Sequence, residues 1–191
     1  MSYYLLECYA DNSGARISSY PELDSPLNNW MSGQRWAIPV PEPLVFEIWE
    51  EDEGEGEMLP MFKTHFLLMT DKLVNVLNES GVDNLDCYDA VIRQTRIGRE
   101  YRNYRAVNIV GLVRAADMAK SESIDLGLGT GGLVSNFFRR LELDESTIGG
   151  ALLFRLAEKI SAIVVHESVK HHLLAKGFDR LSFVEPSKYR G

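Results

Sequence analysis

The stretch IVVHESVKHHLLAKGFDRLSFV, residues 163–184, has a counterpart 96 positions earlier in LLMTDKLVNVLNESGVDNLDCY, residues 67–88. When the two are aligned, apolar residues fall at matching positions, and both contain a glycine followed two residues later by an aspartate. The apolar spacing of each copy predicts a short strand, a helix of about ten residues, a glycine stop and a second strand. We therefore expect two similar strand-helix-strand units to frame the core.

The ends of the two predicted helices agree with this interpretation. Thr70 can accept a hydrogen bond at the start of the first helix, and Asp71 and Glu167 place negative charge in the first turns, where the helix dipole favours it. Gly81 and Gly177 follow the helices at the point where the backbone needs a positive φ, which glycine adopts without steric cost. We expect both glycines to be structural.

The length of 191 residues suits one domain with its own core. Hydrophobic residues at 45% and charged residues at 25% are values typical of globular proteins. We expect a single domain over residues 1–191, in which 1–60 is loop-rich and carries an acidic loop at 47–57, and 61–191 forms an α+β core. Prolines and glycines recur through residues 10–45, and this density favours loops.

The sequence predicts a cytoplasmic protein that does not bind a membrane. Its longest apolar runs, such as ALLF and AIVV, are far shorter than the roughly 20 residues that a membrane span needs. The opening MSYYLLECY lacks the basic head and the small-residue cleavage site of a secretory signal. Cys8 and Cys87 are accordingly expected to be reduced residues of the core and not a disulfide.

Most of the net charge of −8 comes from one segment. It contains seven acids and no base: Glu47, Glu50, Glu51, Asp52, Glu53, Glu55 and Glu57. This acidic segment is either a solvated loop without a binding role or a docking surface that steers a basic partner electrostatically. Trp49 lies within it, and its ring either pins a loop onto the core or belongs to a recognition surface. Trp49 and the acids from Glu50 to Glu57 are the residues we expect to contact a partner.

Alternating or apolar runs predict strands at 2–9, 44–50, 104–113 and 151–158. The run at 104–113 is the best candidate for a central strand, because it is rich in β-branched and apolar residues. Residues 133–144 are compatible with a short helix or a strand. We therefore expect an α+β fold, with a mainly antiparallel sheet, helices packed on it and a loop-rich N-terminal third.

Two further segments resemble binding motifs without the context that those motifs need. Arginine recurs at every third position in Arg93, Arg96, Arg99, Arg102 and Arg105. Arginines interleaved with tyrosines can bind single-stranded nucleic acid, but the chain is acidic overall. The arginines are therefore expected either on a solvated pair of strands or in a patch that pairs with the acidic segment. The glycines of GLGTGG at 127–132 match a dinucleotide fingerprint without its strand-helix context, which favours a loop.

Neither a catalytic nor a metal-binding pattern is complete in the sequence. His166 and Glu167 begin a zinc-protease motif, but the position of its second histidine is occupied by Lys170. The chain has no G-x-S-x-G nucleophile elbow, and its Cys, His and carboxylate residues do not complete a four-ligand cluster. We therefore expect neither enzyme activity nor a metal or other cofactor.

Several motifs, in this order along the chain, resemble immunity family eleven of the bacterial polymorphic-toxin immunity proteins. They are YYLL at 3–6, FLLMTDKLVNVLNESGV at 66–82, YRAVNIVGLV at 104–113, LLFRLAE at 152–158 and VVHESVKHHLLAKGFDRLSFVEP at 164–186. The resemblance extends over most of the chain beyond residue 60 and little of what precedes it. The chain departs from the family pattern at His166, where the family commonly has serine, and in the GLGTGG insert.

The resemblance implies a cytoplasmic protein that binds and occludes a toxin encoded beside it, so that the producing cell survives. It implies no catalytic residues. Asp117 and Ser121, which match the family pattern, are then structural, and we expect Asp117 to pair with Arg155 and fix the ends of the central strands. The alternative class is a non-enzymatic protein-interaction module in bacterial signalling or motility regulation.

Overall fold

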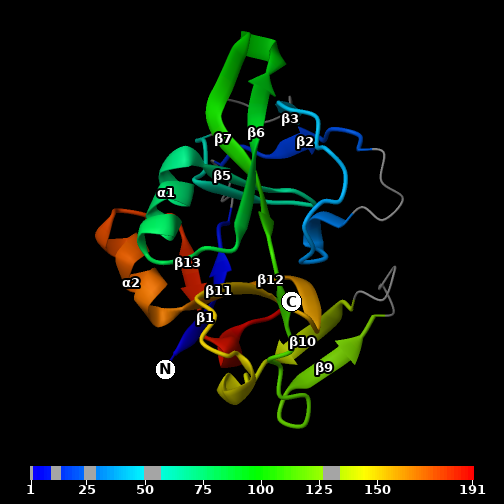
Figure 1. Cartoon of the computed structure of the whole chain (residues 1–191), viewed down its shortest axis with the longest axis vertical. Helices are drawn as coiled ribbons and strands as arrows, with labels where there is room; N and C mark the ends of the chain where they lie inside the picture. Colours follow the sequence, from blue (N-terminus) through cyan, green and yellow to red (C-terminus); the bar gives the residue numbers. More distant parts are fainter. Residues whose placement is uncertain (1, 10–13, 24–28, 50–56, 127–133) are drawn as a thin grey trace.

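The structure is a computed structural model that describes residues 2–9, 14–23, 29–49, 57–126 and 134–191. These residues form an α+β fold that is mostly strand (Figure 1). Its two α-helices are α1 (Asp71–Glu79) and α2 (Glu167–Ala175). Short 3-10 helices are η1 (Asn29–Met31), η2 (Thr95–Ile97), η3 (Glu145–Thr147) and η4 (Pro186–Lys188).

A six-stranded sheet has the order β2-β3-β6-β7-β5-β4. Its strands are β2 (Ile17–Ser19), β3 (Leu44–Ile48), β4 (Met61–Lys63), β5 (Leu67–Thr70), β6 (Leu85–Gln94) and β7 (Arg99–Ile109). Strand β3 pairs with β6 in parallel, and the other pairs of this sheet are antiparallel. Because β7 has a neighbour on both sides, the prediction of a central strand within 104–113 is confirmed.

A five-stranded sheet has the order β13-β1-β12-β11-β8. Its strands are β1 (Tyr3–Glu7), β8 (Leu112–Val113), β11 (Leu153–Leu156), β12 (Lys159–His166) and β13 (Ser182–Val184). Only β8 and β11 pair in parallel within this sheet. A separate antiparallel pair consists of β9 (Glu122–Asp125) and β10 (Asn136–Arg140). Antiparallel pairing therefore predominates among the described strands, although both large sheets are mixed.

The two large sheets share one apolar core, with the six-stranded sheet in the upper part of Figure 1 and the five-stranded sheet below it. Successive side chains of a strand point to opposite faces. In β1, Leu6 accordingly joins the shared core, and Leu5 joins a second cluster on the other face of its sheet. Met69 of β5 and Val107 of β7 belong to the same core. Strands of both large sheets therefore contribute to one core.

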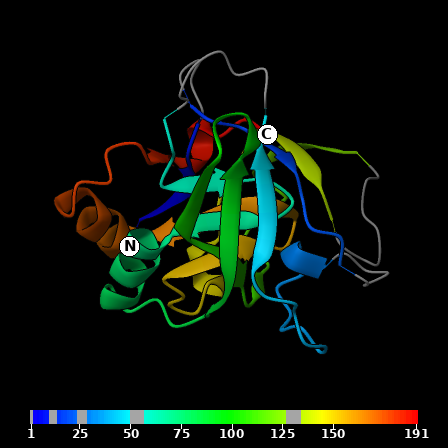
Figure 2. The ribbon, with the colours of Figure 1, turned by 90° about the horizontal axis from the view of Figure 1, so that it is seen from above.

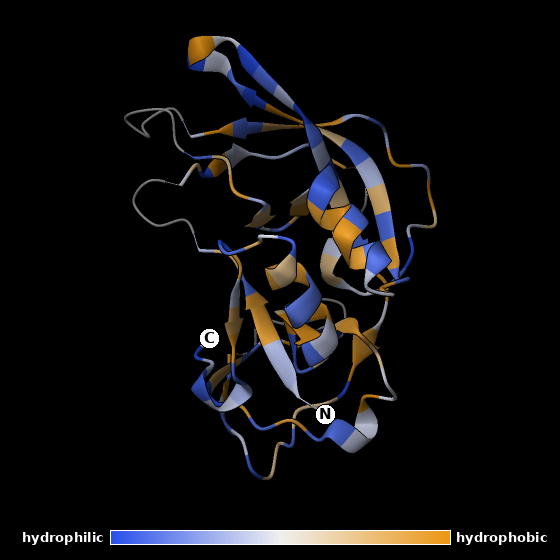
Figure 3. Ribbon diagram, turned by 90° about the vertical axis from the view of Figure 1, so that its left-hand side faces the viewer, coloured by the Kyte–Doolittle hydropathy of each residue, from blue (hydrophilic) through white to orange (hydrophobic). Residues whose placement is uncertain are grey.

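Both α-helices lie on the same side of the molecule in Figures 1 and 2. Each has apolar and polar residues on different faces, which is visible for α1 in Figure 3. Leu73 of α1 and Leu173 of α2 are fully buried in the shared core. Lys176, just after α2, pairs with Glu79 of α1 at 2.9 Å between Nζ and Oε2. The helices thus cover one edge of the core and contact each other.

The helix starts follow the local chemistry of the sequence. Thr70 caps α1 as predicted, because its Oγ1 accepts the Leu73 N–H at 3.3 Å. His166 occupies the corresponding position of α2, where its Nδ1 accepts the Ser168 N–H at 3.2 Å. The first repeat copy contains β5, α1 and the start of β6, and the second contains the second half of β12, α2 and β13. An imidazole nitrogen therefore replaces the usual hydroxyl or carboxylate cap at α2.

Gly81 and Gly177 have φ values of 95° and 81°, as predicted from their places after the helices. Substituting either glycine by alanine forces an L-residue into the left-handed region, which costs about 1–2 kcal/mol. A Cβ at Gly81 would lie 3.2 Å from Leu152 Cδ1, whereas a Cβ at Gly177 meets no atom of the described residues within 4 Å. Gly81→Ala is therefore expected to lower the free energy of unfolding more than Gly177→Ala. Urea denaturation measures both, and equal losses would contradict the contact with Leu152.

The remaining strand predictions are confirmed at the level of element type. Residues 2–9 contain β1, 44–50 contain β3, and 151–158 contain β11. The ambiguous segment 133–144 contains strand β10 and not a helix. Among the described residues between 14 and 43, only the short elements β2 and η1 occur, in agreement with a loop-rich N-terminal third.

Within the part of the chain that the structure describes, no helix is both long and apolar enough to cross a membrane. Cys8 and Cys87 are free thiols. Cys8 is buried, but Cys87 is exposed, so the prediction that Cys87 belongs to the core is wrong. The reason is its place on β6, whose first five residues are only partly covered or exposed, whereas its later residues are largely buried.

Candidate docking surface

Trp49 lies on the surface at the end of β3, with 45% of the residue exposed. Its backbone N–H donates to the Arg16 carbonyl oxygen at 2.8 Å, so its backbone is held in place next to residue 16. Trp30, in contrast, is 1% exposed. Burial in the core therefore applies to Trp30, whereas Trp49 is about half exposed.

The two ends of the acidic segment are attached to the same short stretch of chain. Trp49 bonds to Arg16, and at the other end the Ala15 N–H donates to the Glu57 carbonyl oxygen at 3.1 Å. Because residues 15 and 16 are adjacent, Trp49 and Glu57 are held at neighbouring positions. The acids between them, Glu50, Glu51, Asp52, Glu53 and Glu55, lie outside the described residues.

Glu57 has one partner that sequence analysis did not predict. Its carboxylate Oε2 lies 3.3 Å from Nη2 of Arg180, and the Glu57 side chain is 59% exposed. A pair this exposed contributes roughly 0–1 kcal/mol, because water screens it and ordering two long side chains costs entropy. Its geometrical effect matters more, since it ties the end of the acidic segment to the loop between α2 and β13.

The hairpin formed by β6, η2 and β7 extends beyond the rest of the fold in Figures 1 and 3. Strand β3 runs parallel to β6, with Glu47 beside Arg93, so Trp49 lies at the end of the sheet from which the hairpin projects. Most of the hairpin is hydrophilic, and its tip is hydrophobic (Figure 3). Ile97, in the turn, is 42% exposed. This end of the sheet therefore presents two exposed apolar residues, Trp49 and Ile97.

The arginines of the hairpin are largely paired with nearby acids. Arg93 and Arg102 both pair with Glu100, at 3.0 Å and 2.5 Å. Arg105 pairs with Asp71 of α1 at 2.7 Å and also with Asp89 of β6. The hydrogen bonds from Arg93 and Arg102 lower the pKa of the Glu100 carboxyl below its usual value. The segment is thus a solvated strand pair, one of the two interpretations favoured above, whose positive charge is partly neutralised internally.

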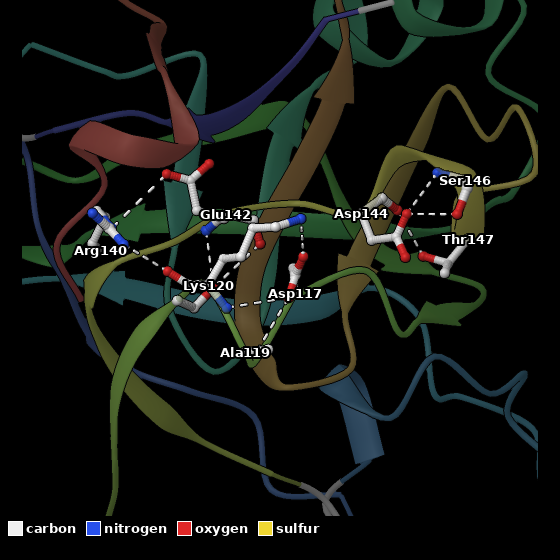
Figure 4. Close-up of polar contacts among 9 residues, drawn as sticks. Asp117, Ala119, Lys120, Arg140, Glu142, Asp144, Ser146 and Thr147 are labelled. Carbon is white, nitrogen blue, oxygen red and sulfur yellow. Dashed lines mark hydrogen bonds and ion pairs between the residues drawn. The ribbon is translucent and has the colours of Figure 1, made fainter.

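Asp117 and Ser121 organise the turn before β9, and Figure 4 shows the contacts of Asp117. The Asp117 carboxylate accepts the N–H groups of Ala119 and Lys120, each at 3.2 Å, and pairs with the Lys120 ammonium at 2.7 Å. The Lys120 hydrogen bond lowers the pKa of Asp117. Ser121 Oγ accepts the Glu142 N–H at 2.9 Å and so joins the turn to the segment after β10. These contacts stabilise the turn and join it to the segment after β10.

The predicted pairing of Asp117 with Arg155 is wrong. Arg155 belongs to β11 and lies beside Ile163 of β12 and Leu112 of β8 in the sheet. Its guanidinium Nη1 donates to the Ile160 carbonyl oxygen at 3.0 Å, and Asp117 pairs with Lys120 instead. The physical reason is that a local turn satisfies the carboxylate, while Arg155 is carried into the interior by its strand.

Sequence analysis also missed a buried ion pair between the two sheets. Glu7, at the end of β1, accepts a hydrogen bond from Lys63 of β4, and their side chains are only 9% and 19% exposed. Burial lowers the pKa of Lys63, and Glu7 opposes that shift. The available signal was weak: Glu7 was a single acid near the end of the strand predicted at 2–9, and no strand was predicted around Lys63.

The described histidines and cysteines do not belong to a metal-binding cluster. No group of three His, Cys, Asp or Glu side chains in the described part of the chain could hold a metal ion. His166 is occupied as the cap of α2, and His172 Nε2 lies 3.7 Å from the Glu79 carboxylate. The GLGTGG insert at 127–132 lies outside the described residues.

No protein-family model matches this chain, and no curated protein is significantly similar to it. The resemblance to immunity family eleven therefore remains a prediction from the motifs quoted above. The candidate docking surface, called the docking surface below, is the one expected from the sequence: Trp49, Glu57 and the acids between them.

Proposed function

We propose that this protein is an immunity protein that binds a cognate bacterial toxin and neutralises it by occlusion, without catalysis. The observation that carries the proposal is the exposed Trp49 at one end of a segment that contributes most of the net charge of −8. A tryptophan beside concentrated negative charge suits a partner with a basic, partly apolar surface. The family resemblance implies that such a partner is a toxin, and we propose that it is the product of an adjacent gene.

The physical roles of the two parts of the docking surface differ. The acids attract a basic partner over a distance and raise the association rate, and this attraction weakens with added salt. Trp49 supplies apolar area once the partner is in place, and tryptophans are among the side chains that dominate binding energy. The held positions of Trp49 and Glu57 reduce the ordering that binding requires at the ends of the segment.

We also propose where the protein acts, how its chain is organised and which partners it does not bind. The protein acts in the cytoplasm, where it meets the toxin as a folded inhibitor. The chain forms one domain, in which the similar units β5-α1-β6 and β12-α2-β13 brace the shared core. Binding involves neither a nucleic acid nor a membrane, because the acidic charge of the chain disfavours both polyanionic surfaces.

The decisive experiment combines co-purification with a growth test. The product of the adjacent upstream gene is expressed with and without this protein, and we expect a stable complex and rescued growth. Replacing Glu50, Glu51, Asp52, Glu53 and Glu55 by their amides is expected to weaken binding and to reduce its dependence on salt. Trp49→Ala is expected to weaken binding about 30-fold, the loss typical of a central aromatic contact of about 2 kcal/mol.

A charge-matched control separates the docking surface from the effect of net charge. The five control residues are exposed acids away from the segment: Glu22, Asp83, Glu122, Glu145 and Glu185. Their conversion to amides is expected to leave the affinity nearly unchanged. Equal affinity for wild type and the segment variant would remove the acidic segment from the interface. A complex without growth rescue would instead support the interaction-module class in signalling or motility regulation.

A further inference from the structure

A cavity of about 390 Å³ lies between the two large sheets. Its wall includes the ion pair of Glu7 and Lys63, together with Ser161 of β12, Arg155 of β11 and Arg190. Its volume is within the range of small-molecule sites, which is roughly 300–1,000 Å³. The cavity is separate from the docking surface around Trp49, and its residues have no role in the proposed immunity function.

Arg155 is the unusual residue of this cavity, because it occupies an inward position of an apolar strand. Leu153, two residues earlier on the same face of β11, belongs to the shared core. Arg155 itself is 2% exposed. Among the described residues, the hydrogen bond of its guanidinium goes to the Ile160 carbonyl oxygen, and its buried Nε has no partner. A guanidinium has five N–H donors, so most of the donors of Arg155 have no acceptor among the described residues.

Among the described residues, no carboxylate forms an ion pair with Arg155. Burial alone lowers its pKa to about 10, so the group stays protonated near neutral pH. The one acid of the cavity wall, Glu7, is already paired with Lys63. Arg155 is close enough to Lys63 to lower the pKa of that lysine further by repulsion. An unpaired buried charge costs several kcal/mol, and an anion in the cavity would relieve that cost.

The amount of charge indicates which anion fits. The cavity wall carries three cations, Lys63, Arg155 and Arg190, and one carboxylate, Glu7, which leaves an excess of two positive charges. A monocarboxylate would neutralise half of that excess. A phosphate monoester carries a charge of about −1.5 to −2 near pH 7 and has three acceptor oxygens. Guanidinium groups bind phosphate oxygens in a bidentate manner, and Ser161 adds a hydroxyl to the wall.

We propose that this cavity binds a small phosphate monoester, with Arg155 as its principal ligand. The phosphate group lies against Arg155 and Ser161, and the organic group occupies the part of the cavity lined by Met31 and Leu67. Binding joins β11 and β12 of one sheet to β4 and β5 of the other, so it stabilises the fold by mass action.

The test uses the whole protein with two probes, inorganic phosphate and glycerol 3-phosphate, and with glycerol as the uncharged control. Calorimetric titration is expected to detect binding of both phosphates and not of glycerol. At a ligand concentration 100 times Kd, the melting temperature is expected to rise. Binding to the folded state alone multiplies the ratio of folded to unfolded protein about 100-fold. Potassium chloride at the same ionic strength is the control, and it is expected to raise the melting temperature less than phosphate does.

Arg155→Met keeps the length of the side chain and removes its charge, and it is expected to weaken phosphate binding at least tenfold. Arg102→Met removes an arginine whose side chain is 66% exposed on the hairpin, and it is expected to bind phosphate like wild type. If Arg155→Met does not fold, Arg155→Lys and Ser161→Ala take its place, and each is expected to weaken binding. Absence of phosphate binding by wild type, or unchanged binding by the folded Arg155 or Ser161 variants, would overturn the proposal.

Discussion

Trp30→Ala is expected to lower the free energy of unfolding by about 3–5 kcal/mol, the usual loss when a large buried aromatic side chain is truncated. The Trp30 ring is 1% exposed and lies 4.8 Å from the ring of Phe66 and 5.4 Å from the rings of Trp36 and Tyr88, measured between centroids. Its removal therefore leaves a cavity inside an aromatic cluster. Chemical denaturation, followed by circular dichroism, measures the loss.

The contribution of the Trp30 hydrogen bond can be separated from that of its volume. Nε1 donates to the Val107 carbonyl oxygen at 2.9 Å and so joins η1 to the central strand β7. Trp30→Phe keeps an aromatic ring but leaves that buried carbonyl without its side-chain donor, a cost of about 1–3 kcal/mol. Trp49→Ala, at an exposed position, is the matched control and is expected to change stability by about 0.5 kcal/mol or less. Equal losses for Trp30→Ala and Trp49→Ala would contradict the burial of Trp30.

Glu7→Gln is expected to cost about 3–5 kcal/mol, because it leaves the buried Lys63 ammonium without its counter-charge. The neighbouring Arg155 repels that ammonium and increases the cost. The matched control is the surface pair of Lys188 and Glu185, whose side chains are 71% and 53% exposed. Glu185→Gln is expected to cost roughly 0–1 kcal/mol, since an exposed pair is screened by water.

The Glu7 variant has a characteristic pH dependence. Burial lowers the pKa of Lys63, and loss of Glu7 removes the interaction that raises it, so this pKa falls further in the variant. Between the folded and unfolded pKa values the unfolded chain binds more protons, and stability rises with pH there. The deficit of Glu7→Gln is therefore expected to be smaller at pH 10 than at pH 7. The double variant with Lys63→Met is expected to regain much of the loss, and a deficit that does not change with pH would argue against a charged Lys63.

Local features of the fold could be predicted from the sequence. Thr70 is the N-cap of α1, and Gly81 and Gly177 have positive φ, because caps and helix stops depend on a few adjacent residues. The strand within 104–113 is central, as its β-branched composition indicated. The position of Trp49 next to the acidic segment was visible too, although its exposure could be known only from the structure.

Features that depend on distant partners could not be predicted. The carboxylate of Asp117 is hydrogen-bonded within its own turn, whereas Arg155 is buried on β11 about forty residues later. Amino-acid composition does not indicate that the two side chains lie apart in the fold. Likewise, Glu7 and Lys63 meet because β1 and β4 belong to different sheets that pack on each other. Pairing of residues far apart in the chain is set by topology, and an apolar pattern specifies which face is buried but not which strand lies opposite.

The place of β1 in the five-stranded sheet has a consequence for synthesis on the ribosome. Strand β1 is made before all strands of the six-stranded sheet, but both of its neighbours, β12 and β13, are made after them. Leu5 and Leu6 therefore stay without their sheet partners while the six-stranded sheet is translated, since every strand of that sheet is complete by Ile109. The part that carries Trp49 is expected to form on the nascent chain first, and β1 is expected to expose apolar side chains until β12 and β13 have been made.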